Sequence, residues 1–198
     1  MSDPVAAALA LPPGRHLIAV AGPPAAGKST FAVTYAADLT AAGRPAQVVP
    51  MDGFHLDNAL LDARGLRARK GAPETFDLRG FARLLQDIRG GGEVIHPLFD
   101  RARDLSVGSA AVLPADVDLA VVEGNYLLYD APGWRDLAPL WSLSVFLDVP
   151  EPVLEERLVA RWLAHGHDAA AAHARAEAND LPNARAIVRH RLPAHILL

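Results

Sequence analysis

Apolar residues in this chain fall into two patterns: short continuous runs, and stretches in which they recur every three or four positions. Short runs of β-prone residues indicate buried strands, whereas the three-and-four spacing indicates one face of a helix. The runs that read as sheet strands are 16–21, 46–50, 118–126 and 142–149, and the main helical stretches are 30–39, 78–88 and 151–162. Strands that alternate with helices predict an α/β fold, in which a parallel sheet is covered by helices on both faces and ligands bind beyond the carboxyl ends of its strands.

The remaining segments are assigned from turn residues and local periodicity. Asp77 is expected to cap the helix over 78–88, which the glycines at 90–92 stop. Residues 1–14 are expected to form an N-terminal arm. After the helix over 78–88, the sequence predicts a strand over 93–100, a short hairpin over 105–112, a surface helix starting at 132, a helix through Ile187 and Val188, and a last strand over 194–198. We expect one domain over 1–198.

Residues 21–30 carry the strongest chemical signal. They read Ala-Gly-Pro-Pro-Ala-Ala-Gly-Lys-Ser-Thr and fit the phosphate-loop pattern G-x-x-x-x-G-K-[ST] between a predicted strand and a predicted helix. Backbone N–H groups of such a loop and the positive end of the helix dipole bind polyphosphate, Lys28 reaches the β- and γ-phosphates, and the Ser29 hydroxyl binds Mg²⁺. A glycine- and proline-rich turn is the alternative. The predicted nucleotide-binding residues are Gly22, Pro23, Pro24, Ala25, Ala26, Gly27, Lys28, Ser29 and Thr30.

Acidic residues follow two of the predicted strands at the same edge of the sheet. Asp52 comes directly after the strand over 46–50, where it could accept the proton of a substrate hydroxyl; a turn cap before Gly53 is the alternative. Glu123 ends the apolar run that starts at 118, where it could hold Mg²⁺ opposite Ser29, or serve as a capping carboxylate. The predicted site therefore has a base and a metal ligand.

Several polar residues near these carboxylates are candidates for the acceptor side. His55 could bind substrate or orient Asp52, or be a satisfied, partly buried histidine. Arg101 and Arg103 are candidate substrate ligands, with surface ion pairs as the alternative. Asn125 and Tyr126 follow Glu123 and could face the acceptor.

Arg157 and Arg161 lie four residues apart on the helix that follows the last central strand. At that spacing they share one face, so they could reach over the γ-phosphate from a lid over about 157–178 and neutralise charge during transfer. Solvated surface arginines are the alternative. The basic loop over 64–77 could line the acceptor pocket, although composition favours a solvated loop whose arginines pair with Glu74 and Asp77.

Composition limits the classes of partner. The 198 residues include 19 basic and 23 acidic side chains, so the charge favours a small molecule over nucleic acid or an anionic membrane surface. The chain has no cysteine, which excludes disulfides, and no apolar run approaches the roughly 18 residues that cross a bilayer. We expect a cytoplasmic protein that binds no nucleic acid and no membrane; its oligomeric state stays open, with a homodimer as one option.

With these residues in place, the chain resembles the phosphoribulokinase/uridine kinase superfamily of P-loop kinases, and most of all its bacterial branch of fructose kinase-like proteins and nucleoside triphosphate hydrolases. The segments that carry the resemblance are Gly22 to Ser29, Asp52-Gly53-Phe54, Gly71-x-Pro73 with Phe76-Asp77, Val122-Glu123-Gly124 and the arginine-bearing helix. The resemblance implies a P-loop three-layer α/β/α fold with a mostly parallel five-stranded sheet in the order 2-3-1-4-5 and a helical lid.

The resemblance also implies roles and cofactors. Asp52 is similar to the family's catalytic base, Lys28 and Ser29 to its ATP and Mg²⁺ ligands, and Glu123 to its Walker B acid. Uridine kinases have Asp-His-Pro where this chain has Gly71-Ala72-Pro73, so a nucleoside is not the first expectation. We expect ATP- and Mg²⁺-dependent phosphoryl transfer to a small hydroxyl compound, a sugar first; the alternatives are a nucleoside or pantothenate-like kinase and a regulatory, non-kinase NTPase.

Overall fold

A parallel five-stranded sheet forms the centre of the computed structural model, which describes residues 3–198. The strands β1 (His16–Ala21), β2 (Ala46–Pro50), β5 (Leu119–Gly124), β6 (Leu143–Phe146) and β7 (Ile196–Leu197) are arranged in the order β2-β5-β1-β6-β7. Counting only these strands along the chain, this is the order 2-3-1-4-5 that the resemblance implied. The predicted bounds of β1 and β2 are confirmed, because each is a short apolar run with buried residues.

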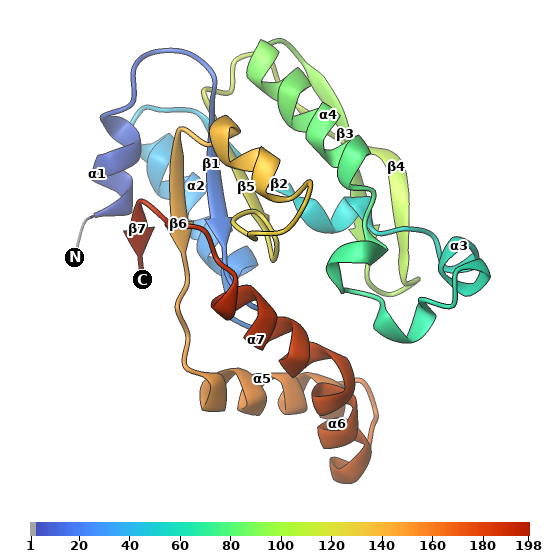
Figure 1. Cartoon of the computed structure of the whole chain (residues 1–198). Helices are drawn as coiled ribbons and strands as arrows, with labels where there is room; N and C mark the ends of the chain where they lie inside the picture. Colours follow the sequence, from blue (N-terminus) through green and yellow to red (C-terminus); the bar gives the residue numbers. More distant parts are fainter. Residues whose placement is uncertain (1–2) are drawn as a thin grey trace.

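Alternate residues of the sheet strands point into two separate cores, as the pleat requires. Ile18 and Val20 pack with α1 (Pro4–Leu9) and α2 (Lys28–Ala41) on one face. Leu17 and Ala19 pack with α4 (Leu78–Gly90) and the 3₁₀ helix η4 (Arg135–Leu140) on the other. The α/β/α layering is therefore confirmed, and Figure 1 shows α2 and α4 on opposite sides of the strands.

A two-stranded antiparallel hairpin lies beside the main sheet. It consists of β3 (Val94–Asp100) and β4 (Leu105–Leu113). The strand predicted over 93–100 is confirmed, but 105–112 is not a hairpin by itself: it is one strand, which pairs with β3. The segment that leads from β2 to α4 is built from short helices: η1 (Met51–Phe54), α3 (Asn58–Ala63), η2 (Arg67–Arg69) and η3 (Pro73–Thr75). The hairpin packs on η1, so this part of the chain walls one side of the space beyond the carboxyl end of β2 (Figure 1).

A helical lid lies on the other side of the space beyond the carboxyl end of β2. It contains α5 (Glu151–Ala164), α6 (Ala169–Arg175) and a π-helical turn η5 (Ala176–Asp180), and α7 (Leu181–Arg189) returns the chain to β7. Leu158, Ala176 and Leu181 form a small core of their own inside it. In Figure 1 this unit lies beyond the arrowheads of the central strands.

Several predicted elements differ from the structure. The strand expected over 118–126 spans Leu119–Gly124, and the one expected over 194–198 spans Ile196–Leu197. The surface helix expected from residue 132 is instead the 3₁₀ helix η4, because Pro139 lies within it and interrupts α-helical bonding. Trp134 and Leu137 are buried, so this segment contributes to the core. The strand expected over 142–149 spans only Leu143–Phe146. The predicted N-terminal arm contains α1, and its first two residues lie outside the described part of the chain. None of the helices in residues 3–198 is long and apolar enough to cross a membrane.

Candidate active site

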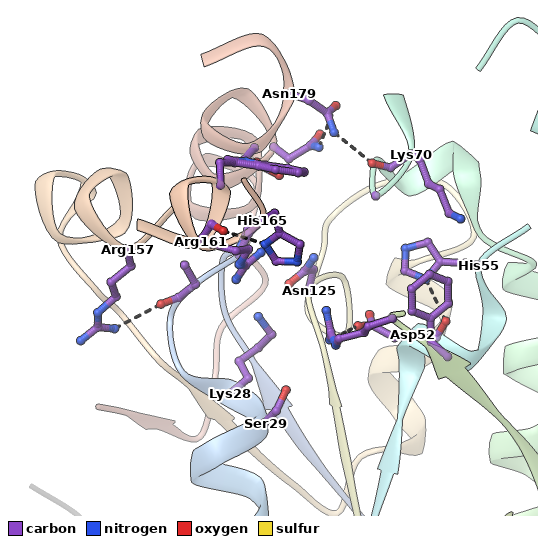
Figure 2. A pocket seen from close by; sticks show the side chains of 18 of the residues that line it. Lys28, Ser29, Asp52, His55, Lys70, Asn125, Arg157, Arg161, His165 and Asn179 are labelled. Carbon is purple, nitrogen blue, oxygen red and sulfur yellow. Dashed lines mark hydrogen bonds and ion pairs between the residues drawn. The ribbon is translucent and has the colours of Figure 1, made fainter. Parts of the chain in front are cut away.

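A cavity of about 860 Å³ opens at the carboxyl ends of β1, β2 and β5. Its walls come from the phosphate loop, η1, the β3–β4 turn and the lid (Figure 2). Ligand cavities of roughly 300–1,000 Å³ are usual for small molecules. The predicted site residues that line it are Pro24, Ala25, Gly27, Lys28, Ser29, Thr30, Asp52, His55, Arg101, Glu123, Asn125, Arg157 and Arg161.

The phosphate loop joins β1 to the long helix α2. Gly27 adopts φ of 93° as the N-cap of α2, a left-handed conformation that favours glycine, so the loop can turn directly into the helix. The N-terminal turn of α2 therefore points its free N–H groups into the cavity, where they suit an anion. The loop residues Gly22, Pro23 and Ala26 are buried and do not line the cavity.

Lys28 is held rigidly within this loop. The residue is only 8% exposed, and its ammonium donates a hydrogen bond of 2.8 Å to the carbonyl oxygen of Pro23. Burial lowers the pKa of Lys28 to about 8, and the nearby Glu123 and Asp52 carboxylates oppose that shift. A polyphosphate would act in the same direction as these carboxylates and favour the charged ammonium.

Ser29, in the first turn of α2, contacts Glu123, near the carboxyl end of β5. Glu123 pairs in register with Val20 of β1 and Pro50 of β2, and its Oε1 accepts a hydrogen bond of 3.1 Å from the Ser29 hydroxyl. Burial, followed by the charge of Asp52, raises the pKa of Glu123. A hydroxyl next to a carboxylate fits Mg²⁺, which takes oxygen ligands and is usually held by one or two side chains together with substrate phosphates and water.

Asp52 lies on η1, immediately after β2. Its side chain is 24% exposed, and Oδ2 accepts a hydrogen bond of 2.7 Å from the Arg101 guanidinium. The adjacent Gly53 allows the hairpin to pack closely: a Cβ at this position would lie 2.7 Å from the carbonyl carbon of Pro97. The contact between η1 and β3 therefore fixes where the carboxylate points.

His55 forms an aromatic wall next to Asp52. Its ring lies 4.1 Å from the ring of Phe76 and 4.6 Å from that of Phe99, between centroids, and Nδ1 lies 2.8 Å from the backbone carbonyl oxygen of Asp52. Burial lowers the pKa of His55, so the ring is neutral at neutral pH. His55 thus positions the η1 backbone and offers an apolar face to the cavity.

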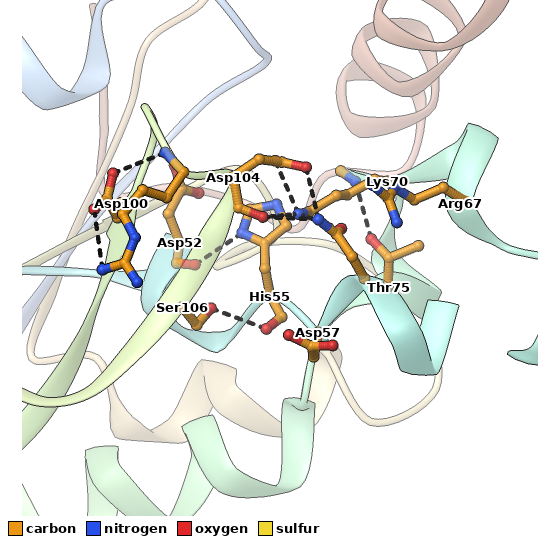
Figure 3. Close-up of polar contacts among 12 residues, drawn as sticks. Asp52, His55, Asp57, Arg67, Lys70, Thr75, Asp100, Asp104 and Ser106 are labelled. Carbon is orange, nitrogen blue, oxygen red and sulfur yellow. Dashed lines mark hydrogen bonds and ion pairs between the residues drawn. The ribbon is translucent and has the colours of Figure 1, made fainter. Parts of the chain in front are cut away.

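Lys70 and Asp104 also line the cavity, and sequence reasoning did not single them out. The Lys70 ammonium lies 2.8 Å from both Asp104 Oδ1 and the Asp104 carbonyl oxygen (Figure 3). It also lies 2.8 Å from Asn58 Oδ1 and 5.0 Å from the centroid of the Phe99 ring. These contacts tie the basic loop to the β3–β4 turn. The loop is only partly as predicted: Arg69 pairs with Glu74, but Lys70 turns inward.

The lid contacts the phosphate loop through Arg157, one of its two predicted arginines. Arg157 donates a hydrogen bond of 3.2 Å to the carbonyl oxygen of Ala25, and Arg161 lines the cavity. Asn179, from η5, donates to the carbonyl oxygen of Lys70 at 3.0 Å. The lid therefore touches both the nucleotide side and the acceptor side (Figure 2).

Two predicted acceptor ligands lie elsewhere. Tyr126 is 1% exposed and its hydroxyl donates to the carbonyl oxygen of Gly71 at 2.7 Å, so it packs in the core and does not line the cavity. The side chain of Arg103 is 67% exposed, lies 3.9 Å from the Asp100 carboxylate and does not line the cavity.

A family model agrees with this geometry. The model of the phosphoribulokinase/uridine kinase family matches residues 17–193. This chain belongs to that family. The match covers every site residue described above.

Individual relatives support the same assignment. A crystal structure of a protein from Silicibacter sp. TM1040, provisionally named fructose transport system kinase, is 54% identical, with a TM-score of 0.95 over 98% of this chain and 96% of that one. The protein YggC of Escherichia coli (strain K12) is 36% identical over 94% of this chain and 78% of its own. A protein of Schizosaccharomyces pombe (strain 972), provisionally named uridine kinase, is 33% identical over 93% and 83%.

Proposed function

We propose that this kinase transfers the γ-phosphoryl group of ATP to a hydroxyl of a small metabolite, with a sugar as the first candidate. The observation that carries the proposal is the position of Asp52, which lines the same cavity as Lys28 and the Ser29–Glu123 pair. A phosphate loop alone supports nucleotide binding. A carboxylate beside it adds what an alcohol acceptor needs, a group that takes the hydroxyl proton.

The residues divide the transfer step between them. The α2 N-terminus and Lys28 bind the polyphosphate. As the acceptor oxygen forms a bond to the γ-phosphorus, Asp52 accepts the hydroxyl proton. The bond from the γ-phosphorus to the β–γ bridging oxygen breaks, and ADP is released. Ser29 and Glu123 would hold Mg²⁺, which neutralises phosphate charge when bound. Arg161, and Arg157 after release from Ala25, would offset charge that develops on the transferred group.

Two alternatives remain as outcomes of the test. A nucleoside or pantothenate-like acceptor would use the same catalytic residues with a different acceptor wall. A regulatory NTPase would bind ATP without an acceptor, but Asp52 at the cavity favours transfer over this reading. The name of the Silicibacter relative, at 54% identity, supports a sugar over the other acceptors.

The test is a coupled ADP-release assay with Mg-ATP and a panel of sugars, nucleosides and pantothenate. Wild type should turn over well above its ATP-only rate with one acceptor, and both Lys28→Ala and Asp52→Asn should lose that gain. Asp52→Asn should still bind ATP and lose about 10²-fold or more in transfer. ATP binding that no acceptor stimulates would favour the regulatory alternative.

A further inference from the structure

The proposed base is engaged by a cation. Asp52 Oδ2 accepts the 2.7 Å hydrogen bond from Arg101, which comes from the turn that follows β3. This guanidinium therefore holds one of the two oxygens that could take the hydroxyl proton. Because the Arg101 side chain is 68% exposed and its ion pair with Asp52 is made at its tip, it can move at small cost.

Arg101 from the hairpin lines the cavity together with two cations of the basic loop, Arg67 and Lys70. An ammonium has three N–H donors, and Lys70 has three acceptors within 2.8 Å on Asn58 and Asp104. Lys70, in the cavity wall, therefore links Asn58 to Asp104. It has no donor left for a substrate.

The two arginines differ from Lys70 in this respect. A guanidinium has five N–H donors in a planar fork. Arg101 uses one of its nitrogens on Asp52, and Arg67 uses one on Asp62 at 3.0 Å, with 46% of its side chain exposed. Both arginines line the cavity and keep N–H donors that these two ion pairs do not use.

A neutral acceptor has no charge with which to compete for Arg101. A carboxylate or phosphate does, because it can accept two parallel N–H bonds from the guanidinium fork. Transfer of Arg101 from Asp52 to such a group would free the base at the moment the acceptor hydroxyl arrives. The neutral, aromatic faces of His55 and Phe99 would contact the carbon skeleton between the two groups.

We propose that the acceptor is a polyol that carries an anionic group, a carboxylate or a phosphate, and that this group draws Arg101 away from Asp52, with Arg67 as its second ligand. This inference rests on the proposed function and narrows its substrate class. Arg101 is then a specificity-determining residue. The transfer step itself is unchanged, and the anion takes no part in bond making.

The experiment compares acceptors that share one carbon skeleton: a neutral polyol, its aldonate and its phosphate ester. We expect kcat/KM to be about 10- to 100-fold higher for one of the two anionic members than for the neutral one. The member that wins identifies the anion as carboxylate or phosphate. In Arg101→Gln the anionic-to-neutral ratio should fall toward one, through loss of activity on the anionic member, while Arg101→Lys should keep part of it.

The control is Arg83→Ala, which removes an exposed arginine of α4 outside the cavity and should leave the ratio unchanged. Calorimetric binding of the anionic polyol, with a non-hydrolysable ATP analogue present, gives a second readout and should weaken in Arg101→Gln. If wild type prefers the neutral polyol, or if Arg101→Gln lowers kcat/KM equally for both acceptors, this inference is overturned and the proposed function stands. Failure of every alcohol to stimulate ADP release overturns the proposed function, and this inference with it.

Discussion

Replacing Gly53 with alanine tests whether the contact between η1 and β3 positions the base. The new Cβ would lie 2.7 Å from the Pro97 carbonyl carbon and 3.2 Å from the Leu98 nitrogen, whereas ordinary contact begins at 3.4 Å. The Pro97 carbonyl oxygen lies closer still, so the backbones must separate by at least the 0.7 Å between 2.7 and 3.4 Å. All of these atoms are backbone, so no side-chain rotation can relieve the clash.

The cost follows from this geometry. Overpacking of this kind destabilises a protein by about 1–3 kcal/mol. A shift of about 1 Å in a catalytic group can cost about 10²-fold in rate. Since Asp52 is the residue before Gly53, we expect Gly53→Ala to lose turnover beyond what its stability loss explains.

Urea denaturation gives the free energy of unfolding, and the coupled ADP assay gives kcat for the folded protein. Gly108→Ala is the matched control, because Gly108 lies in β4 of the same hairpin and a Cβ there meets nothing within 4 Å; its effect should stay within about 0.5 kcal/mol. If Gly53→Ala matched Gly108→Ala in both stability and kcat, the argument that this contact positions Asp52 would be wrong.

Two further predictions concern buried cationic and titratable groups. Lys28→Met keeps the buried stem but removes the charge that faces the polyphosphate, so transfer should fall by about 10²–10³-fold in a protein with an unchanged circular dichroism spectrum; turnover within twofold of wild type would contradict the role of Lys28. His96 is 2% exposed, and burial lowers its pKa below the ordinary 6.5. The unfolded chain therefore binds the proton more readily, so His96 adds stability above about pH 6.5 that is lost as the pH falls through its folded pKa. His96→Leu should reduce the slope of stability against pH in urea melts from about pH 7 to about pH 5, and an unchanged slope would refute this assignment.

The strands and the phosphate loop could be predicted because their signals are local. Buried parallel strands are continuous apolar runs, and the loop pattern fixes glycine, lysine and serine at set spacings. The segment from residue 132 could not be assigned this way. Its apolar residues suit a helix face, but Trp134 and Leu137 pack into the core and Pro139 imposes 3₁₀ geometry.

The acceptor side was less predictable because long-range contacts build it. Lys70 is held at the cavity by Asp104, which lies 34 residues later in the chain. The sequence of the basic loop does not show which of its basic side chains turns inward. Arg101 and Arg103 looked equivalent in sequence, but the turn after β3 directs one to Asp52 and the other to Asp100. Tyr126 follows Glu123 closely, yet it packs against Phe76 and Trp134 in the core.

The most direct test of the central claim is the identity of the phosphorylated product. ³¹P NMR of Mg-ATP turnover with the best acceptor should show ADP and a new phosphate ester in equal amounts, and Asp52→Asn should form the ester about 10²-fold more slowly while ATP still binds. If the signal that grows with ADP were inorganic phosphate, with no ester at any acceptor concentration, Asp52 would not be the base of a phosphoryl transfer to an alcohol.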